Sequence, residues 1–214
     1  MTPEAPTTRD VEIVAGEDGV ARCWWAITAP EYRAYHGTEW GFPVADDVRL
    51  FEKLSLEGFQ AGLSWLTILR KRDAFRRAFA GFEFEQVARF GDREVARLLG
   101  DAGIVRHRGK IEAVINNARR ALELVQEEGS LSHYVWRFEP DARTDEFDRA
   151  GVANLSVTAE SKALAKDLKR RGWRFIGPTT AYAFMQAMGI VNDHVGGCDV
   201  RARVDSARAL FRRP

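Results

Sequence analysis

The chain of 214 residues has only two cysteines, Cys23 and Cys198, which lie near opposite ends of the sequence. So few thiols do not suggest the disulfide framework of a small secreted domain. The first residues, MTPEAPTTRDVE, lack the basic and then apolar pattern of a secretory signal. No apolar run approaches the roughly 20 residues that a membrane-spanning helix needs. We therefore expect a cytoplasmic protein that does not bind a membrane.

The sequence also lacks an excess of charge of either sign, since its formal net charge at pH 7 is +1. The basic residues are nevertheless concentrated in three segments, residues 70–77, 104–120 and 162–174. Such an uneven distribution can form a surface that faces phosphate groups without giving the protein a high pI. Three solvated helix faces would have the same composition, so charge alone leaves both interpretations open.

Strand patterns are nearly absent as well, and the expected class is therefore all-α. Helical spacing of apolar residues predicts one helix from Asp46 or Asp47 to about Ala61, a second that Ser64 caps, and a long third from Arg106 to about Gln126. We expect a flexible N-terminal tail over residues 1–18, one domain over residues 19–200 and a basic C-terminal tail over residues 201–214.

Two further helix starts are predicted from residues that can accept a hydrogen bond from a free backbone N–H group. Asp92 is expected to cap the second of two short helices within residues 84–99. Ser161 is expected to cap a lysine-rich helix that ends at Gly172. Residues 139–158 have the weakest pattern, and we expect a loop or an insertion there.

The rest of the chain is organised around the stretch from Gly172 to Cys198. A glycine-bounded turn follows the lysine-rich helix, and a new helix begins at Pro178, where a missing N–H group costs nothing. That helix should stop near Gly189, which can adopt the left-handed conformation. A turn at a helix N-terminus directs free N–H groups outward, and this arrangement is suited to binding phosphate.

Aromatic side chains are concentrated between residues 24 and 40, with few aliphatic residues among them. They are Trp24, Trp25, Tyr32, Tyr35 and Trp40. An ordinary core would use Leu, Ile and Val, so this composition favours a pocket in which a planar ligand stacks. A compact aromatic core with satisfied N–H and O–H groups is the alternative.

Glu57 lies on the apolar stripe of its predicted helix, together with Leu50, Leu54 and Ala61. A buried carboxylate is costly unless it has a partner. Either a backbone amide or an arginine pairs with it, or it binds a ligand. Trp65 follows shortly after the helix break at Gly62 and Leu63, where its side chain can project into a cleft.

Each cysteine has a histidine nearby in the sequence, as Cys23-x12-His36 and His194-x3-Cys198. Two thiolates and two imidazoles suit tetrahedral zinc, which would join the N-terminal and C-terminal segments. With no open ligand position evident, such a metal would be structural. The spacing matches no known finger, and buried unpaired cysteine is also common.

These residues together resemble bacterial DNA-3-methyladenine glycosylase I, a family within the helix-hairpin-helix DNA glycosylase superfamily. The resemblance spans about residues 21 to 199. The matching segments are RCWWA at 22–26, YRAYHGTEWGFP at 32–43, LEGFQAGLSWLTILRKR at 56–72, DAGIVRHRGKIEAVINNAR at 101–119 and KRRGWRFIGPTTAYAFMQAMGIVNDHVGGC at 169–198.

The resemblance implies a helix-hairpin-helix glycosylase fold and a specific set of site residues. The zinc ligands would be Cys23, His36, His194 and Cys198. The base-recognition pocket would be formed by Trp25, Tyr32, Tyr35, Trp40, Glu57 and Trp65. Gly62 and Leu63 would probe the gap left by an extruded nucleotide. The hairpin from Trp173 to Thr180, with Phe175, Gly177 and Thr179, would hold one DNA phosphate.

The implied activity is base-excision repair of double-stranded DNA with release of 3-methyladenine. Related superfamily members carry a catalytic aspartate where this chain has Asn192, so the resemblance implies a monofunctional enzyme that uses water and leaves the strand intact. Glu57 would recognise the base, and water activation ranks second among its possible roles. Two alternatives stay open: a DNA-binding module without catalysis, and an enzyme of the same fold acting on another lesion. We expect a monomer.

Overall fold

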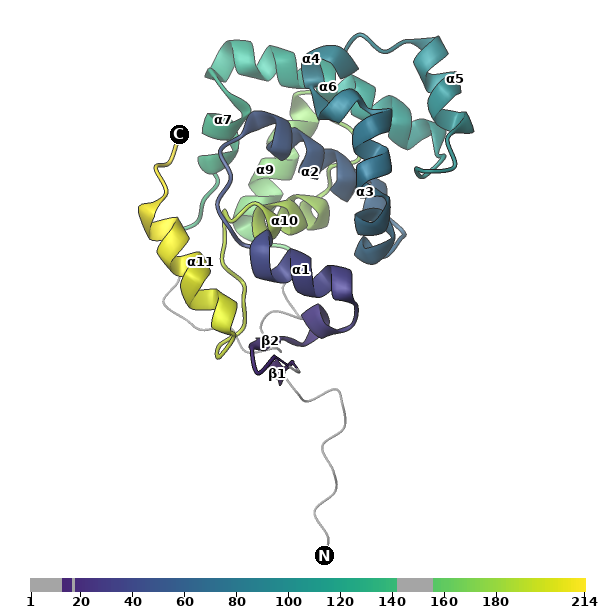
Figure 1. Cartoon of the computed structure of the whole chain (residues 1–214). Coiled ribbons are helices and arrows are strands. Elements are labelled where there is room, and N and C mark those ends of the chain that lie inside the picture. Colours follow the sequence, from purple (N-terminus) through teal and green to yellow (C-terminus); the bar gives the residue numbers. More distant parts are fainter. Residues whose placement is uncertain (1–12, 17, 142–155) are drawn as a thin grey trace, which may run out of the picture.

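The computed structural model describes residues 13–16, 18–141 and 156–214, and within this part of the chain helices dominate (Figure 1). The larger helices are α1 (Pro30–Thr38), α2 (Asp47–Gln60), α3 (Trp65–Ala78), α5 (Asp92–Gly100), α6 (Arg108–Glu128), α9 (Ala159–Arg170), α10 (Pro178–Ala187) and α11 (Asp199–Leu210). The short ones are η1 (Trp24–Ile27), η2 (Ala80–Phe82), α4 (Phe84–Val87) and α7 (Leu131–Trp136). The prediction of a mostly helical protein is confirmed.

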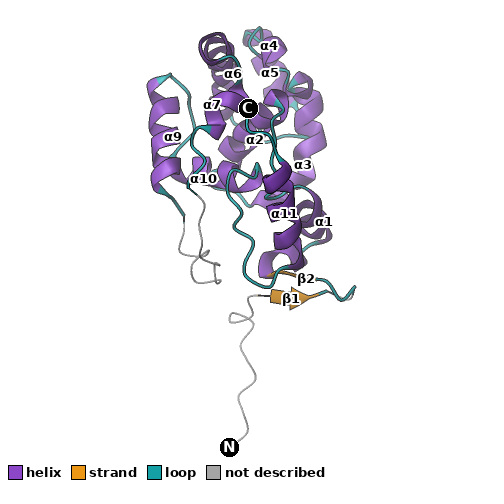
Figure 2. Cartoon of the chain, turned by 90° about the vertical axis from the view of Figure 1, so that its left-hand side faces the viewer, coloured by secondary structure: helices purple, strands orange, loops and turns teal. Residues whose placement is uncertain are grey.

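One small sheet departs from the all-α expectation. Strands β1 (Ile13–Ala15) and β2 (Ala21–Cys23) pair in antiparallel register. Figure 2 shows this pair at one end of the molecule, beside α11 and α1. Part of the predicted N-terminal tail is therefore ordered, whereas residues 1–12 lie outside the described residues. None of the helices within the described ranges is long and apolar enough to cross a membrane.

Helix α2 is the centre of the fold and packs against α3, α6, α7 and α10. Every side chain from Leu50 to Phe59 is buried, polar ones included. Asp46 caps the start of α2 by accepting a hydrogen bond from the Arg49 N–H group at 2.8 Å. At the other end, Lys110 Nζ donates to the carbonyl oxygen atoms of Phe59 and Ala61. Both ends of this buried helix thus have partners for backbone groups that the helix itself leaves unpaired.

Two of the predicted caps are wrong by one to three residues. Gly91 precedes α5, and its N–H group donates to the Glu94 carboxylate at 3.0 Å, so Asp92 is the first residue of α5. Thr158 caps α9 by accepting from the Ser161 N–H group at 3.1 Å. The Ser161 hydroxyl accepts in return from the Thr158 N–H group at 2.8 Å. A reciprocal pair spaced three residues apart places the cap at its first member.

The predicted C-terminal tail is largely the helix α11. Val200 and Val204 of this helix are buried, and their spacing of four residues places them on one face. Arg208 also donates to the Gly189 carbonyl and to Glu139, which fastens the helix to the domain. We expected a tail because residues 201–214 are basic, and this expectation overlooked the apolar pair. Most of the predicted loop at 139–158 lies outside the described residues.

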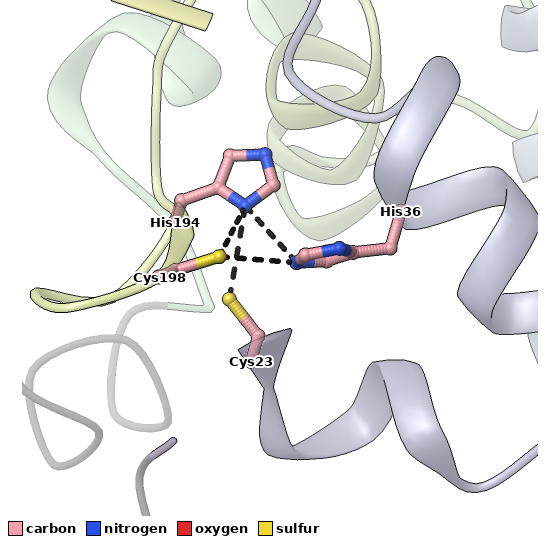
Figure 3. A group of neighbouring side chains, drawn as sticks. All are labelled: Cys23, His36, His194 and Cys198. Carbon is pink, nitrogen blue, oxygen red and sulfur yellow. Dashed lines mark hydrogen bonds between the residues drawn. The ribbon is translucent and has the colours of Figure 1, made fainter. Parts of the chain in front are cut away.

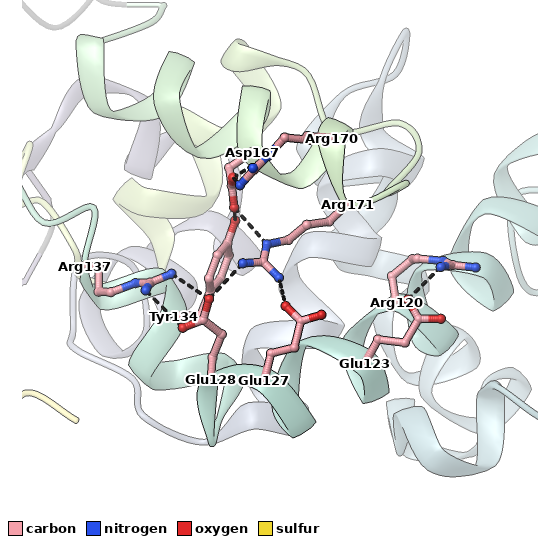
Figure 4. A network of polar contacts seen from close by, with 9 residues as sticks. All are labelled: Arg120, Glu123, Glu127, Glu128, Tyr134, Arg137, Asp167, Arg170 and Arg171. Carbon is pink, nitrogen blue, oxygen red and sulfur yellow. Dashed lines mark hydrogen bonds and ion pairs between the residues drawn. The ribbon is translucent and has the colours of Figure 1, made fainter.

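A network of ion pairs holds α9 against α6 and α7 (Figure 4). Arg171 donates to Asp167 at 2.9 Å and to Glu128 of α6 at 2.8 Å. The Tyr134 hydroxyl of α7 donates to Asp167 at 2.8 Å. These contacts stand directly before the turn between α9 and α10, and they fix the position from which that turn starts.

An aromatic cavity beside a cluster of cysteine and histidine

Four side chains from the two ends of the chain converge in one buried cluster, Cys23, His36, His194 and Cys198 (Figure 3). Their potential ligand atoms all lie within 4.8 Å of one another. Because two sulfur atoms and two ring nitrogen atoms meet at one point, this cluster can hold a metal ion (Figure 3).

The secondary structure brings the four residues together from distant segments. Cys23 ends β2, His36 lies in the last turn of α1, and His194 and Cys198 lie between α10 and the start of α11. His194 Nε2 lies 3.1 Å from the Trp40 carbonyl oxygen atom, to which it donates when Nδ1 faces the cluster as a ligand. Burial lowers the pKa of His36, which keeps its ring in the neutral form that binds metals.

An aromatic cavity of about 340 Å³ lies next to this cluster. The structure places in its wall all six residues that the resemblance implied for a base pocket: Trp25, Tyr32, Tyr35, Trp40, Glu57 and Trp65. They come from η1, α1, α2 and α3 and from the segment after α1. None of the four cluster residues is among those that line the cavity.

Trp25 joins the cavity wall to the cluster of cysteine and histidine. Its ring meets the ring of Trp40 edge-on, with 5.1 Å between centroids, and the ring of His36 edge-on at the same separation. It also meets Tyr32 edge-on at 5.6 Å. Perpendicular rings place the positive edge of one against the negative face of another, which stabilises the arrangement. The wall is therefore a continuous aromatic assembly that contacts the cluster through His36.

Glu57 is buried in this cavity, with only 6% of its surface exposed, and its partner is Lys53. Lys53 Nζ lies 2.7 Å from Glu57 Oε1 and donates to the Tyr35 hydroxyl at 2.8 Å. The ammonium group also lies 3.3 Å from the centroid of the Trp65 ring, a cation–π contact. The sequence left a backbone amide or an arginine as candidate partners of Glu57, and neither is correct.

Lys53 was missed although the sequence contained a signal for it. Lys53 and Glu57 are four residues apart, the spacing at which side chains of one helix face meet. Burial lowers the pKa of Lys53, and the charge of Glu57 opposes that effect. Burial together with the charge of Glu57 raises the pKa of Tyr35 well above its usual range. Tyr35 therefore remains a neutral phenol that accepts from the lysine.

Other residues of the cavity wall were missed. They are the α10 residues Ala183, Gln186 and Ala187, together with Gln60, whereas Trp24 was among the aromatic residues expected to form a pocket. The three α10 residues are spaced as one helical face. Gln186 Nε2 donates at 2.9 Å to the buried carboxylate of Asp193, which fixes the orientation of its amide. Small side chains at 183 and 187 leave room for a flat ligand.

Two exposed apolar side chains lie in the connections between helices. Leu63 lies between α2 and α3, and Phe175 lies in the turn between α9 and α10. Leu63 is 42% exposed and lies between Gln60 and Trp65, which both line the cavity. Gly62 before it has a φ of +81°, which favours glycine. Phe175 is 45% exposed and has a φ of +59°, an unusual backbone conformation for a bulky residue.

The turn between α9 and α10 is clamped to α6 by two asparagines. Asn117 accepts from the Arg174 N–H group at 2.8 Å and donates to the Arg174 carbonyl at 2.9 Å. Asn116 donates to the Gly172 carbonyl at 2.9 Å. Gly177 precedes α10 and has no side chain with which to cap it, so the N–H groups of the first turn, at Thr179 and Thr180, can donate to an anion.

Asn192 is placed away from the cavity wall. Its amide donates to Asp205 at 2.7 Å, and its oxygen atom accepts from the His194 N–H group at 3.2 Å. Asn192 thus helps to shape the loop that carries His194, and its side chain is not among those that line the cavity.

The fold and site place the chain among DNA glycosylases. It aligns with a crystal structure of 3-methyladenine DNA glycosylase I at 46% identity and a TM-score of 0.77, covering 83% of this chain and 98% of that chain. A structure of a variant of such an enzyme in complex with 3-methyladenine aligns at 35% identity and a TM-score of 0.78, covering 83% of this chain and 95% of that one.

Sequence comparison narrows this class to one family. DNA-3-methyladenine glycosylase 1 of Escherichia coli (strain K12) is 46% identical over 178 residues, which are 83% of this chain and 95% of that protein. The corresponding protein of Haemophilus influenzae is 42% identical over 179 residues, 83% of this chain and 96% of that protein. The methyladenine glycosylase family model matches residues 25–202, and the chain belongs to this family.

Proposed function

We propose that this protein is a base-excision repair enzyme that hydrolyses the N-glycosidic bond of alkylated double-stranded DNA and releases 3-methyladenine. The observation that carries the proposal is the aromatic cavity with the buried carboxylate of Glu57 in its wall. Its volume of about 340 Å³ suits a small ligand such as a single purine base. Family membership and the relatives described above support the same activity.

Base recognition follows from the side chains in the wall. Stacking of a base on an aromatic ring contributes about 1–3 kcal/mol, and Trp65 and Trp25 supply such faces. Glu57 Oε1 is engaged by Lys53, and Oε2 is the atom that we assign to the amino group of the adenine. Activation of water is the second candidate role of Glu57.

The chemistry needs little help with the leaving group. Methylation at N3 makes the adenine cationic, so the glycosidic bond is already weakened and the base departs as a neutral molecule. The enzyme has to extrude the nucleotide, which costs a few kcal/mol, and to hold it in the cavity. Asn192 is neutral and its amide is engaged by Asp205 and His194. We therefore assign no catalytic base at that position and propose a monofunctional enzyme with water as the nucleophile.

We further propose that the cluster of Cys23, His36, His194 and Cys198 binds structural zinc. With bonds of about 2.3 Å to sulfur and about 2.0–2.1 Å to nitrogen, a tetrahedral site has S···N edges of about 3.5 Å and an N···N edge of about 3.3 Å. The corresponding distances are 3.5 to 3.7 Å and 3.1 Å. The residues therefore fit the metal, whose role is to fasten the N-terminal segment to the C-terminal one.

The DNA contacts are proposed for one face. There α9, the turn between α9 and α10, and α10 itself act as a helix-hairpin-helix element. The backbone N–H groups around Gly177 and Thr179 donate to one DNA phosphate. Phe175 and Arg174 flank this position. The exposed side chain of Leu63, which follows the turn at Gly62, would fill the space that the extruded nucleotide leaves.

A DNA-binding module without catalysis would use the same turn, and free 3-methyladenine distinguishes it from the glycosylase. The cavity contains four tryptophans, so binding of the base should change the intrinsic fluorescence of the protein. The glycosylase is expected to bind the free base and lose affinity in Glu57→Gln. A module would bind duplex DNA and give no response to the free base.

A further inference from the structure

The cluster of cysteine and histidine is closed off from solvent. His36 and His194 have no exposed surface, and Cys23 and Cys198 are only 1% and 5% exposed. An ion bound among these four side chains is therefore shielded from water and from any competing ligand. The elements that provide this shielding are helix α11 and strand β1, which lie at the same end of the molecule (Figure 2).

Helix α11 packs directly on the cluster. Val200 and Val204 are buried in one apolar group with Cys198. Gly41 adjoins both the helix and a cluster histidine, because a Cβ atom at this glycine would lie 3.4 Å from Val204 Cγ1 and 3.1 Å from His194 Nε2. A residue without a side chain is what lets the helix come this close to the cluster.

Strand β1 adds a second contact. Ile13 is the partner of Cys23 in the antiparallel pair, and its side chain packs against the same apolar group. A Cβ atom at Gly197 would lie 3.6 Å from Ile13 Cγ1, so the strand also contacts the loop that leads to Cys198. Both cysteines of the cluster are thus adjacent to β1.

Hydrogen bonds fasten α11 to the two segments that carry the cluster residues. At the start of the helix, the Asp199 carboxylate accepts from the Ala21 N–H group of β2 at 2.7 Å. Farther along, Asp205 accepts from the side-chain amide of Asn192 at 2.7 Å, two residues before His194. Detachment of α11 would release both segments at once.

Much of this arrangement lies outside the part of the chain that the family model matches. That part is residues 25–202, and Ile13, Val204 and Asp205 lie beyond it. The six residues assigned to the base pocket all lie within it. The contacts of α11 and β1 are therefore additional to the residues of the proposed reaction, and they converge on the cluster.

We propose that α11 and β1 form a cover that retains the proposed zinc, so that the ion leaves only after α11 has detached from the domain. The proposal rests on the structural zinc proposed above. Loss of a bound metal needs water or another ligand to approach the ion, and a buried group becomes accessible through local opening of the elements around it. The rate of zinc loss is therefore set by the opening of α11 and not by global unfolding.

The test measures how fast zinc-loaded protein transfers its metal to excess 4-(2-pyridylazo)resorcinol, whose zinc complex absorbs visible light. Val204→Ala removes buried contacts of α11, and Asp205→Ala removes the partner of Asn192 from an exposed position. Val87→Ala is the matched control for the first variant, because Val87 of α4 is a fully buried valine in the main core and not in the group around the cluster. Asp73→Ala, at an exposed aspartate of α3, is the control for the second.

The α11 variants are expected to lose zinc faster than the wild type at a temperature well below the melting transition. Val204→Ala should accelerate the loss by about tenfold, because buried methyl groups no longer hold the helix in place. Asp205→Ala should accelerate it by about threefold through the lost hydrogen bond. Val87→Ala and Asp73→Ala should leave the rate unchanged, although Val87→Ala lowers the melting temperature. Amide hydrogen exchange in α11, followed with zinc bound, should accelerate together with zinc loss.

Two results would overturn the cover: unchanged rates of zinc loss in the folded α11 variants, or an equal acceleration in Val87→Ala. Asp205→Ala decides the matter even where Val204→Ala does not fold, because Asp205 is exposed. Purified protein that takes up no zinc would refute the zinc assignment and the cover with it. Zinc that is bound but lost at the same rate in every variant refutes the cover alone, so the two failures are distinguishable.

Discussion

The ring of Trp40 meets the ring of His194 with 4.7 Å between centroids, and the Trp40 carbonyl lies 3.1 Å from His194 Nε2. Trp40 lines the cavity, whereas His194 belongs to the cluster of cysteine and histidine. The two sites therefore share one wall. The position of the stacking surfaces depends on whether the cluster is assembled.

Removal of the proposed zinc should accordingly disturb base binding as well as stability. Cys198→Ser, or extraction of the metal by a strong chelator, is expected to lower the free energy of unfolding by at least about 4 kcal/mol, the stabilisation given by a ligand at a thousand times its Kd. Metal content by mass spectrometry, thermal melting and affinity for 3-methyladenine should fall together. Full affinity for 3-methyladenine in the metal-free protein would contradict the prediction that the cavity depends on the cluster.

Replacement of Glu57 by Gln exchanges the charged acceptor proposed for the adenine amino group for a neutral amide and leaves Lys53 without its counter-charge. A hydrogen bond to a charged group contributes about 1.5–3 kcal/mol, so base affinity and excision rate should fall by roughly 10- to 100-fold. Glu52→Gln is the matched control, because Glu52 is a buried carboxylate of the same helix that pairs with Arg76 outside the cavity. Equal losses in both variants would refute the role of Glu57.

Leu63→Ala should weaken action on duplex DNA while leaving affinity for the free base unchanged. The leucine is 42% exposed and lies in the sequence between Gln60 and Trp65 of the cavity wall, and we propose that it replaces the extruded nucleotide in the stack. Loss of most of its apolar surface should reduce excision from duplex DNA by about tenfold. Leu210→Ala, at an even more exposed leucine near the end of α11, should have no effect on either measurement.

Asn117→Ala should loosen the turn between α9 and α10. The buried side chain accepts from one backbone group of Arg174 and donates to another, and both lose their partner in the variant. Each buried group left unpaired costs about 1–3 kcal/mol, and greater flexibility of the turn offsets part of this cost. DNA affinity should fall in binding assays at fixed salt, while affinity for free 3-methyladenine stays within about twofold. Unchanged DNA affinity would exclude the turn as a phosphate site.

The ion-pair network on α9 predicts a pH dependence of stability. Burial raises the pKa of Asp167, but hydrogen bonds from Arg171, Arg170 and Tyr134 outweigh it and bring the pKa to about 2. Its contribution to stability is therefore fully present above about pH 4 and is lost as pH falls toward 2. Solvent screening limits it to roughly 1 kcal/mol.

The variant Asp167→Asn should be less stable at neutral pH by that amount, and its free energy of unfolding should change less between pH 4 and pH 2. Denaturant unfolding at several pH values measures both quantities. Asp73→Asn, at an aspartate whose side chain is 80% exposed, is the control. Parallel pH profiles for the wild type and Asp167→Asn would contradict the assignment.

Much of the fold could be predicted because its signals are local. The helix start at Ser64, whose hydroxyl accepts from the Thr67 N–H group, can be identified from the residue type and the apolar spacing after it. The cap of α9 was misplaced because Thr158 and Ser161 are equally good candidates until their reciprocal bonds are seen. The strand pair was missed since three residues per strand are too few for a period.

The site divides in the same way. Residue types with strong chemical signatures, such as the two Cys/His pairs and Glu57 on an apolar stripe, could be selected from the sequence. Lys53 could not be assigned, because a lysine four residues before a glutamate usually marks an exposed pair, and its burial depends on α1 and α3 closing over it. Ala183 and Ala187 contribute by leaving space in the cavity, and an alanine in the sequence does not indicate such a role.

The most direct test of the account is chromatography of the free bases that the purified protein releases from methylated duplex DNA, together with electrophoresis of the same DNA under denaturing conditions that keep abasic sites intact. The account predicts release of 3-methyladenine with the strand uncut, and a much lower rate in Glu57→Gln than in Glu52→Gln. Protein that contains its metal and binds the duplex, yet releases no base, would contradict it and favour a DNA-binding module.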